Sequence, residues 1–250
     1  MTVSRVSRGG VTPLLTTVLD QLGQEIVSGL IAEDETFTLQ DLSNRFNISR
    51  TVAREVMRAL EQLGLVTSSR RVGIRVLPES EWAVFDQAVI KWRWSASNQR
   101  SRQLYELNQL RYAVEPLAAG IATRNATVEQ ARELTDLAMK MEDLAARSDA
   151  DSDLVRAAYL ELDKRYHTLV LEASGNRMFA ALACSVLVQL EARTIYGDLP
   201  VIPSATSRQA HTEVAHAIAA GDREAAENAS RRIMHEFWDT IFGGKPAGRR

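Results

Sequence analysis

Apolar residues recur every three or four positions through most of this 250-residue chain. Such spacing predicts a mainly α-helical protein, and the first helix is expected over residues 14–30. The stretch from Phe37 to Val76 has a different pattern, because two short helical segments separated by a turn precede two short β-branched runs. After Pro78 the helical pattern resumes and continues almost to the C-terminus. The pattern therefore predicts two domains, and only the first contains strands.

The order of elements between Phe37 and Val76 is that of a winged helix-turn-helix. Thr38 is the expected N-cap of the first helix, Asn47 suits the turn, and Ser49 is placed to cap the second helix. Gly64 supplies a glycine at the end of that helix. The predicted elements are a helix over 38–46, a turn at 47–49, a helix over 50–63, and strands at 65–66 and 74–76.

Charge distinguishes this segment from a generic pair of helices. Seven arginines and two glutamates lie between Arg45 and Arg75, whereas the whole chain has a net charge of −2. A local basic excess on a helix-turn-helix favours duplex DNA as the partner, and the alternative is a solvated helix face beside a purely structural wing. The candidate DNA contacts are the first turn of the second helix and the tip of the wing, namely Ser49, Arg50, Thr51, Arg70 and Arg71.

The remainder of the chain is predicted to form an all-helical bundle of six or seven helices. The expected domains are residues 11–77 and 78–243, flanked by flexible tails at 1–10 and 244–250. Helices are expected at 80–95, 102–124, 127–147, 154–173, 177–196, 204–220 and 222–242.

Composition excludes several classes of protein. The chain is 45% hydrophobic, yet it has no apolar run long enough to span a bilayer and no signal-peptide pattern, so a soluble cytoplasmic protein without membrane contact is expected. Cys184 is the single cysteine, which excludes a disulfide scaffold. Its apolar neighbours predict a buried structural thiol.

The first domain resembles the GntR superfamily of bacterial transcription regulators. The resemblance rests on Ser49-Arg50-Thr51-Val52-Ala53-Arg54-Glu55, then Leu60, and Gly64-Leu65-Val66. It adds Arg54 to the expected DNA contacts. Many members have arginine where this chain has Gln40, and Pro-Ser-Glu where it has Phe37-Thr38-Leu39. Because glutamine can still bind phosphate or adenine, Gln40 is also a candidate contact, but the operator preference cannot be transferred.

The second domain resembles FCD, the helical ligand-binding domain of FadR-like GntR regulators. The matching residues are Arg111, Glu115-Pro116, Ala118-Ala119, Asp163, His167, Ser174-Gly175-Asn176, His211 and the run from Ala217 to Ala226. The resemblance implies a homodimer that binds a palindromic operator. It also implies an effector pocket in the helical domain.

Asp163 and His167 are four residues apart and therefore share one helical face, and His211 comes from a later helix. A carboxylate and two imidazoles suit a divalent ion such as zinc, nickel or manganese. Family members often have a histidine as fourth ligand, and alignment places Ile233 there. His235 lies two residues later, about 200° around a helix.

Several alternatives remain open at this stage. The three residues could hold an ion with water, could hydrogen-bond a ligand directly, or could form a buried pair without any ligand. Arg111 could bind the carboxylate of an effector or form a salt bridge to Glu115. Asn176 could reach the pocket or could cap the helix that begins at Arg177.

These residues predict a ligand-responsive regulator, expected to be a repressor rather than an enzyme, whose effector is a small carboxylate. Within the resemblance, the tryptophans Trp82, Trp92 and Trp94 and the missing last-helix histidine favour a sugar acid such as gluconate. The polar residues disfavour a long acyl chain. Lactate and a fatty acyl-CoA are alternative effectors. The alternative class is a metal-dependent enzyme acting on a small organic acid, with Asp163, His167 and His211 around a catalytic ion. A further alternative is a bundle that binds another protein.

Overall fold

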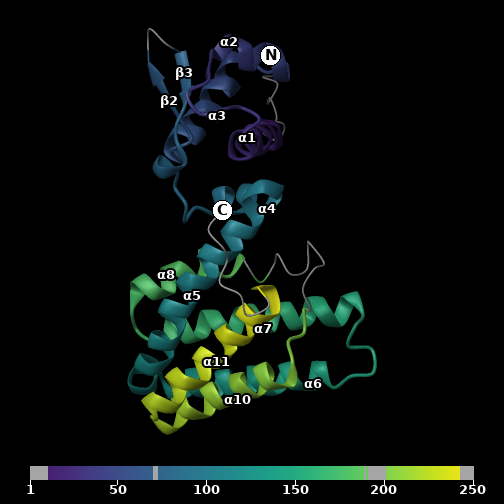
Figure 1. The fold of residues 1–250 in the computed structure, drawn as a ribbon, viewed down its shortest axis with the longest axis vertical. Coiled ribbons are helices and arrows are strands. Elements are labelled where there is room, and N and C mark those ends of the chain that lie inside the picture. Colours follow the sequence, from purple (N-terminus) through teal and green to yellow (C-terminus); the bar gives the residue numbers. More distant parts are fainter. Residues whose placement is uncertain (1–10, 70–72, 189, 191–200, 243–250) are drawn as a thin grey trace, which may run out of the picture. The chain divides into compact units, whose positions relative to one another are not determined.

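The computed structural model describes residues 11–69, 73–188, 190 and 201–242 (Figure 1). The chain divides into two compact units between Gln103 and Leu104. The described part is mostly helical with one small antiparallel sheet, which confirms the predicted fold class. The tails predicted at 1–10 and 244–250 lie outside the described residues.

The first unit contains the helix-turn-helix and its wing. The sheet has the strand order β1-β3-β2, with Thr36 paired to Arg75 and Val66 paired to Val76. Strand β1 was not expected, because two residues are too short to show an alternating pattern. The elements are α1 (Val11–Val27), β1 (Thr36–Phe37), α2 (Leu39–Phe46), α3 (Arg50–Gln62), β2 (Val66–Ser69), β3 (Gly73–Val76), a 3-10 turn (Glu79–Glu81) and α4 (Gln87–Ser95).

The caps predicted for α2 and α3 are confirmed. The Thr38 hydroxyl accepts from the backbone N–H of Asp41, and the Asp41 carboxylate accepts from the backbone N–H of Thr38, which forms a capping box. The Ser49 hydroxyl accepts from the backbone N–H of Val52. Both helices therefore begin where the sequence places a side chain able to satisfy a free N–H group.

Helix α4 begins later than expected and packs against α1. Asp86 caps it at Gln87, whereas a helix had been predicted from residue 80. Trp92 is buried and donates from its indole N–H to Asp20 of α1 at 3.1 Å. Residues 78–103 therefore belong to the first compact unit, and the boundary predicted after residue 77 stays a prediction.

The second unit is built from helices around one apolar core. Helix α10 packs against α6 and α11, α6 packs against α7, and α7 packs against α8. The predicted end of the fifth bundle helix near residue 196 lies outside the described residues. The helices are α5 (Ser97–Asn125, which begins in the first unit), α6 (Val128–Ala145), α7 (Asp153–Ala173), α8 (Arg177–Val186), α10 (Ala205–Ala220) and α11 (Arg223–Phe242).

The expectation that Cys184 is buried is wrong. Cys184 is exposed, because the inner face of α8 is formed by Ala183 and Leu187 instead. On α5, Leu117 is exposed. The buried face of α5 is polar at its centre and small beyond it, with Leu104, Leu107, Asn108, Arg111, Glu115, Ala118, Ala119 and Ala122.

The two glycines Gly64 and Gly29 provide a test of how closely the chain approaches itself after α3. Both have a left-handed φ, +72° and +79°, so alanine is strained at either position. A Cβ on Gly64 would lie 2.0 Å from the carbonyl oxygen of Glu81, whereas a Cβ on Gly29 meets nothing within 4 Å. Gly64→Ala should therefore destabilise the protein by more than the roughly 1 kcal/mol expected for Gly29→Ala. Urea denaturation measures both, and equal losses would contradict this close approach.

Candidate functional site

A groove in the first unit brings together three of the predicted DNA contacts. It has a volume of about 490 Å³ and lies between the two helices of the helix-turn-helix and the wing strands. Gln40, Arg50 and Arg54 line it, together with Thr38, Leu39, Met57, Ser68, Ser69, Gly73 and Ile74. Exposed cationic and amide side chains beside a recognition helix are suited to phosphates and base edges.

Gln40 links the two helices of this motif. Its side-chain oxygen accepts from the Arg50 guanidinium at 2.6 Å, and its side-chain nitrogen donates to Asn44 at 2.8 Å. The position where the family often has arginine therefore holds an amide that orients the neighbouring arginine of α3. The sequence did not indicate this contact, because Gln40 and Arg50 lie ten residues apart.

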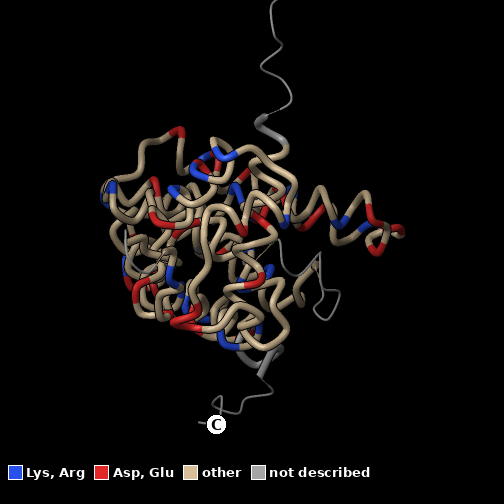
Figure 2. The backbone as a smooth tube through the Cα atoms, turned by 90° about the horizontal axis from the view of Figure 1, so that it is seen from above, with Lys and Arg blue, Asp and Glu red and all other residues tan. Residues whose placement is uncertain are grey.

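Two of the four remaining candidates for DNA contact lie within the described residues. Ser49 and Thr51 are exposed at the start of α3, and the Ser49 hydroxyl also serves as the helix cap. Arg70 and Arg71 lie outside the described residues. Figure 2 shows basic and acidic residues interspersed along the described chain. The basic excess of the helix-turn-helix comes from the seven arginines and two glutamates between Arg45 and Arg75.

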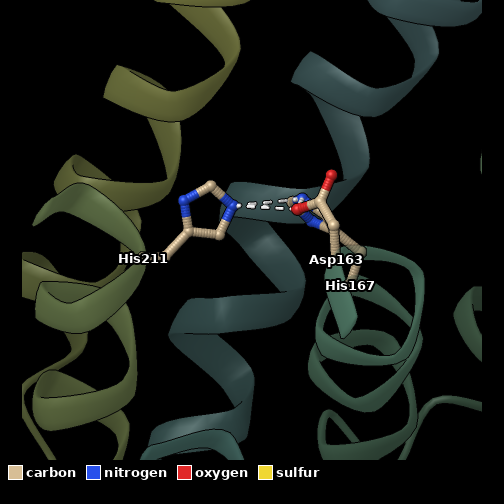
Figure 3. A group of neighbouring side chains, drawn as sticks. All are labelled: Asp163, His167 and His211. Carbon is tan, nitrogen blue, oxygen red and sulfur yellow. Dashed lines mark hydrogen bonds and ion pairs between the residues drawn. The ribbon is translucent and has the colours of Figure 1, made fainter. Parts of the chain in front are cut away.

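The second candidate site lies in the helical unit, where Asp163 and His167 from α7 meet His211 from α10 (Figure 3). All three are at least 96% buried. The Nε2 atoms of the two histidines are 3.4 Å apart, and each lies 3.4 Å from Oδ1 of Asp163. The three ligands predicted from sequence therefore converge on one point.

The outer nitrogens of both imidazoles are held by acceptors. Nδ1 of His167 lies 2.7 Å from a carboxylate oxygen of Glu115, and Nδ1 of His211 lies 2.7 Å from the backbone carbonyl oxygen of Ser207. Neither oxygen can donate, so each Nδ1 carries the ring proton and, in the neutral ring, Nε2 presents a lone pair to the centre. Metal-binding histidines are oriented in this way.

Arg111 and Glu115 of α5 complete the cluster. Arg111 Nε donates to Glu115 at 2.5 Å, and Arg111 Nη2 lies 3.3 Å from His167 Nε2. The salt bridge that the sequence left as an alternative is therefore present, and Arg111 also reaches the histidine. Glu115 was noted in the sequence as a family marker and as a partner of Arg111, but its second partner, His167, required the fold.

Burial and charge act against each other on these groups. Burial alone would raise the pKa of Glu115, but Arg111 and His167 outweigh it and lower that pKa to about 2. Burial would lower the pKa of His167, and Glu115 is the main opposing influence, so the net shift is upward. Burial would raise the pKa of Asp163, yet its interactions with His167 and His211 hold that pKa well below its usual range. Both carboxylates are therefore ionised at neutral pH.

Asp163 has no donor within this cluster when both imidazoles are neutral. Asp163 Oδ1 is buried and has no hydrogen-bond donor. A neutral His167 can accept from Arg111 but leaves Asp163 facing two lone pairs, whereas a charged His167 can donate to Asp163 but then opposes the guanidinium. A cation at the centre would be bound by both imidazoles and by Asp163. The donor set therefore fits a divalent ion of the zinc, nickel or manganese type.

Other candidate residues lie outside the cluster. The side chain of Asn176 accepts from the backbone N–H of Met178 and caps α8, which is the alternative role considered for it. Ile233 is buried in the apolar core. His235 is exposed and hydrogen-bonded to Tyr112, and His216 is exposed. Within the described residues, the histidines that reach the cluster are His167 and His211.

Comparison with known proteins decides the family. Residues 106–236 match the FCD domain, which covers more than half of the chain, and residues 14–76 match the bacterial regulatory proteins of the gntR family. The chain belongs to the GntR family. It is a transcriptional regulator of that family rather than an enzyme, and the resemblance inferred from the sequence is confirmed.

Several relatives of this GntR-family regulator are repressors. The galactonate operon transcriptional repressor of Escherichia coli (strain K12) is 28% identical over 217 residues, which span 85% of this chain and 90% of the relative. The transcriptional repressor NanR of Cronobacter sakazakii is 27% identical over 239 residues, which span 92% of this chain and 88% of NanR. A probable D-xylose utilization operon transcriptional repressor of Paenarthrobacter nicotinovorans is 26% identical over 222 residues, which span 87% of this chain and 84% of that repressor.

A solved structure supports the fold. Lar of Listeria monocytogenes, described as controlling the expression of the agr system, matches with a TM-score of 0.58 at 14% identity and covers 97% of this chain and 100% of its own. Within the described residues of this regulator, none of the helices is both long and apolar enough to cross a membrane.

Glu115→Gln tests the charge balance of the cluster. The pKa of Glu115 is lowered from 4.5 to about 2 in the folded protein, so its ionised form stabilises the fold fully above pH 4.5 and progressively less as the pH falls toward 2. The variant leaves Arg111 buried without its carboxylate partner. It should lose about 3–5 kcal/mol at neutral pH, measured by urea denaturation, and the loss should shrink as the pH is lowered toward 3.

The matched control for this experiment is Glu161→Gln, which removes the exposed partner of Lys164. An exposed ion pair of this kind contributes little to stability, so the control should denature like the wild type at both pH values. A Glu115→Gln loss that stayed constant from neutral pH to pH 3 would contradict the charge balance described above.

Proposed function

We propose that this regulator is a ligand-responsive repressor that binds a two-fold symmetric operator as a dimer and whose DNA affinity is controlled by a small carboxylate. The observation that carries the proposal is the buried cluster of Arg111, Glu115, Asp163, His167 and His211. Buried ionised groups are costly unless each has a partner, and Asp163 Oδ1 at the centre of this cluster has no hydrogen-bond donor.

The charges of the cluster indicate what it would bind. With neutral imidazoles, Arg111, Glu115 and Asp163 give a net charge of −1. A divalent ion at the two Nε2 atoms and Asp163 Oδ1 would change this to +1, and one carboxylate would then neutralise it. Arg111, whose Nη2 lies 3.3 Å from His167 Nε2, is near enough to donate to that carboxylate while its Nε stays bound to Glu115. Direct binding of an acid without the ion uses the same residues.

A sugar acid is the effector class that we favour. Relatives that cover most of this chain are repressors of a galactonate operon and, as a probable assignment, of a D-xylose utilization operon. The polar, fully buried cluster also suits a hydroxylated acid better than a long acyl chain, which requires an apolar tunnel. D-Galactonate and D-gluconate are therefore the first ligands to test.

On the DNA side, the groove lined by Gln40, Arg50 and Arg54 is proposed as part of the operator-binding surface. The two arginines are exposed, lie on the recognition helix and belong to the basic stretch of the sequence. Ser49 and Thr51 are proposed to contact the same half-site, and Arg70 and Arg71 to contact the backbone or minor groove. We place this action in the cytoplasm, where a bacterial chromosome lies.

Control of DNA binding follows from linkage. An effector that binds more tightly to the form with low DNA affinity shifts the population toward that form. The coupling free energy in such systems is typically about 1–3 kcal/mol, which corresponds to roughly 5- to 150-fold in affinity.

Arg50→Ala and Arg54→Ala test the DNA surface. Each should abolish binding to a duplex selected by the wild-type protein from a random library, because each removes a groove-lining cation from the recognition helix. Fluorescence anisotropy measures the affinity, and unchanged thermal denaturation shows that the fold is intact. Arg147→Ala removes an exposed arginine in the other unit and should bind DNA like the wild type. Normal binding by either recognition-helix variant would refute this surface.

A thermal-shift screen tests the effector. D-Galactonate or D-gluconate at 100 times its dissociation constant should stabilise the protein by about 2.7 kcal/mol. A chelator should weaken this stabilisation if an ion carries the acid, and Asp163→Asn should weaken it in the same way. Stabilisation by none of a panel of sugar and organic acids would refute the effector, whereas stabilisation that a chelator leaves unchanged would refute the ion.

A further inference from the structure

Asn108 is a buried polar residue that the proposed effector site does not use. Its side chain is 1% exposed, and neither the amide nitrogen nor the amide oxygen has a hydrogen-bond partner. Buried amides are nearly always hydrogen-bonded, because an unpaired one loses its contacts with water and gains nothing in return. An unpaired donor and acceptor on one buried side chain therefore require a partner that the chain itself does not supply.

The helix geometry places this amide on the face that carries the polar cluster. Asn108 and Glu115 are seven residues apart, about 20° short of two full turns, and Arg111 lies between them on the same buried side of α5. The rise from Asn108 to Arg111 is about 4.5 Å along the helix. The carbon chain of a sugar acid spans such a distance when its carboxylate is held by Arg111.

The chemistry of the amide selects the group it would bind. A carboxylate only accepts hydrogen bonds and a metal ion only accepts lone pairs, so either would leave one atom of the amide unpaired. A hydroxyl group both donates and accepts, and can pair with Oδ1 and Nδ2 together. We propose that Asn108 recognises a hydroxyl of the effector and thereby restricts the ligand to hydroxylated carboxylic acids. This inference rests on the effector site proposed above and names its ligand class.

The test compares two six-carbon acids, D-galactonate and hexanoate, on the full-length protein. Isothermal calorimetry measures both affinities for the wild type, for Asn108→Leu and for Gln103→Leu, with the same metal content throughout. Leucine has the branched shape of asparagine, with the same number of heavy atoms, and no polar atoms. Gln103 is the matched control, since it lies on the same helix, is buried, and also has an unpaired amide oxygen, but belongs to the first unit.

The wild type should prefer D-galactonate to hexanoate. Asn108→Leu should lose at least about tenfold in affinity for D-galactonate, as expected for one lost hydrogen-bonding group, and should keep its affinity for hexanoate. Without ligand, its thermal midpoint should equal or exceed that of the wild type, because an apolar side chain replaces an unpaired amide. Gln103→Leu should keep the preference for D-galactonate. A merely structural Asn108 would instead change the midpoint and leave the preference unaltered.

Two results would overturn this inference while leaving the proposed function intact. One is a wild-type protein that binds both acids equally well. The other is Asn108→Leu binding D-galactonate with wild-type affinity, which would show that the amide does not bind the ligand. Binding of neither acid, nor of D-gluconate, by the wild type would refute the effector site and this inference with it. Asn108→Ala repeats the comparison if leucine lowers the midpoint.

Discussion

The ionised carboxylate of Glu115 is the group on which the polar centre of the helical unit depends. It neutralises Arg111 inside the bundle and holds the ring proton of His167 on Nδ1. With that proton fixed, Nε2 of His167 turns toward Asp163 and His211. Removing Glu115 would leave a guanidinium without its counterion in the interior and would free the imidazole to reorient.

This arrangement explains why a helical bundle keeps so many polar groups in its core. Tyr166 extends the network, since its hydroxyl donates to the backbone carbonyl of His211 at 2.6 Å. Burial is the main cause that raises the pKa of Tyr166, so its hydroxyl remains a donor at neutral pH. The cluster is thus rigidly held on its outer side and incompletely paired at its centre, which is the arrangement of a preorganised binding site.

Much of the fold could be predicted from the sequence, because its signals are local. Thr38 and Ser49 place helix starts through their own hydroxyls, and the i, i+4 spacing of Asp163 and His167 puts both on one face of α7. The position of His211 beside them was expected only from the family resemblance.

What the sequence could not supply depends on contacts between distant elements. The pairing of Glu115 with His167 joins α5 to α7, and the pairing of Gln40 with Arg50 joins α2 to α3. The bundle also buries Asn108, Arg111 and Glu115 of α5 beside leucines and alanines of the same helix. Helical periodicity predicts which residues share a face of a helix. Which face turns inward depends on the side chains that neighbouring helices place against it.

The central claim is that the buried cluster and the DNA surface are thermodynamically coupled, and reciprocity tests it most directly. The affinity for a selected duplex is measured with and without saturating D-galactonate, and the affinity for D-galactonate is measured with and without saturating duplex. Linkage requires the two ratios to be equal, and we predict a common factor of at least about fivefold. If the protein binds both ligands but neither ligand changes the affinity for the other, the coupling is contradicted.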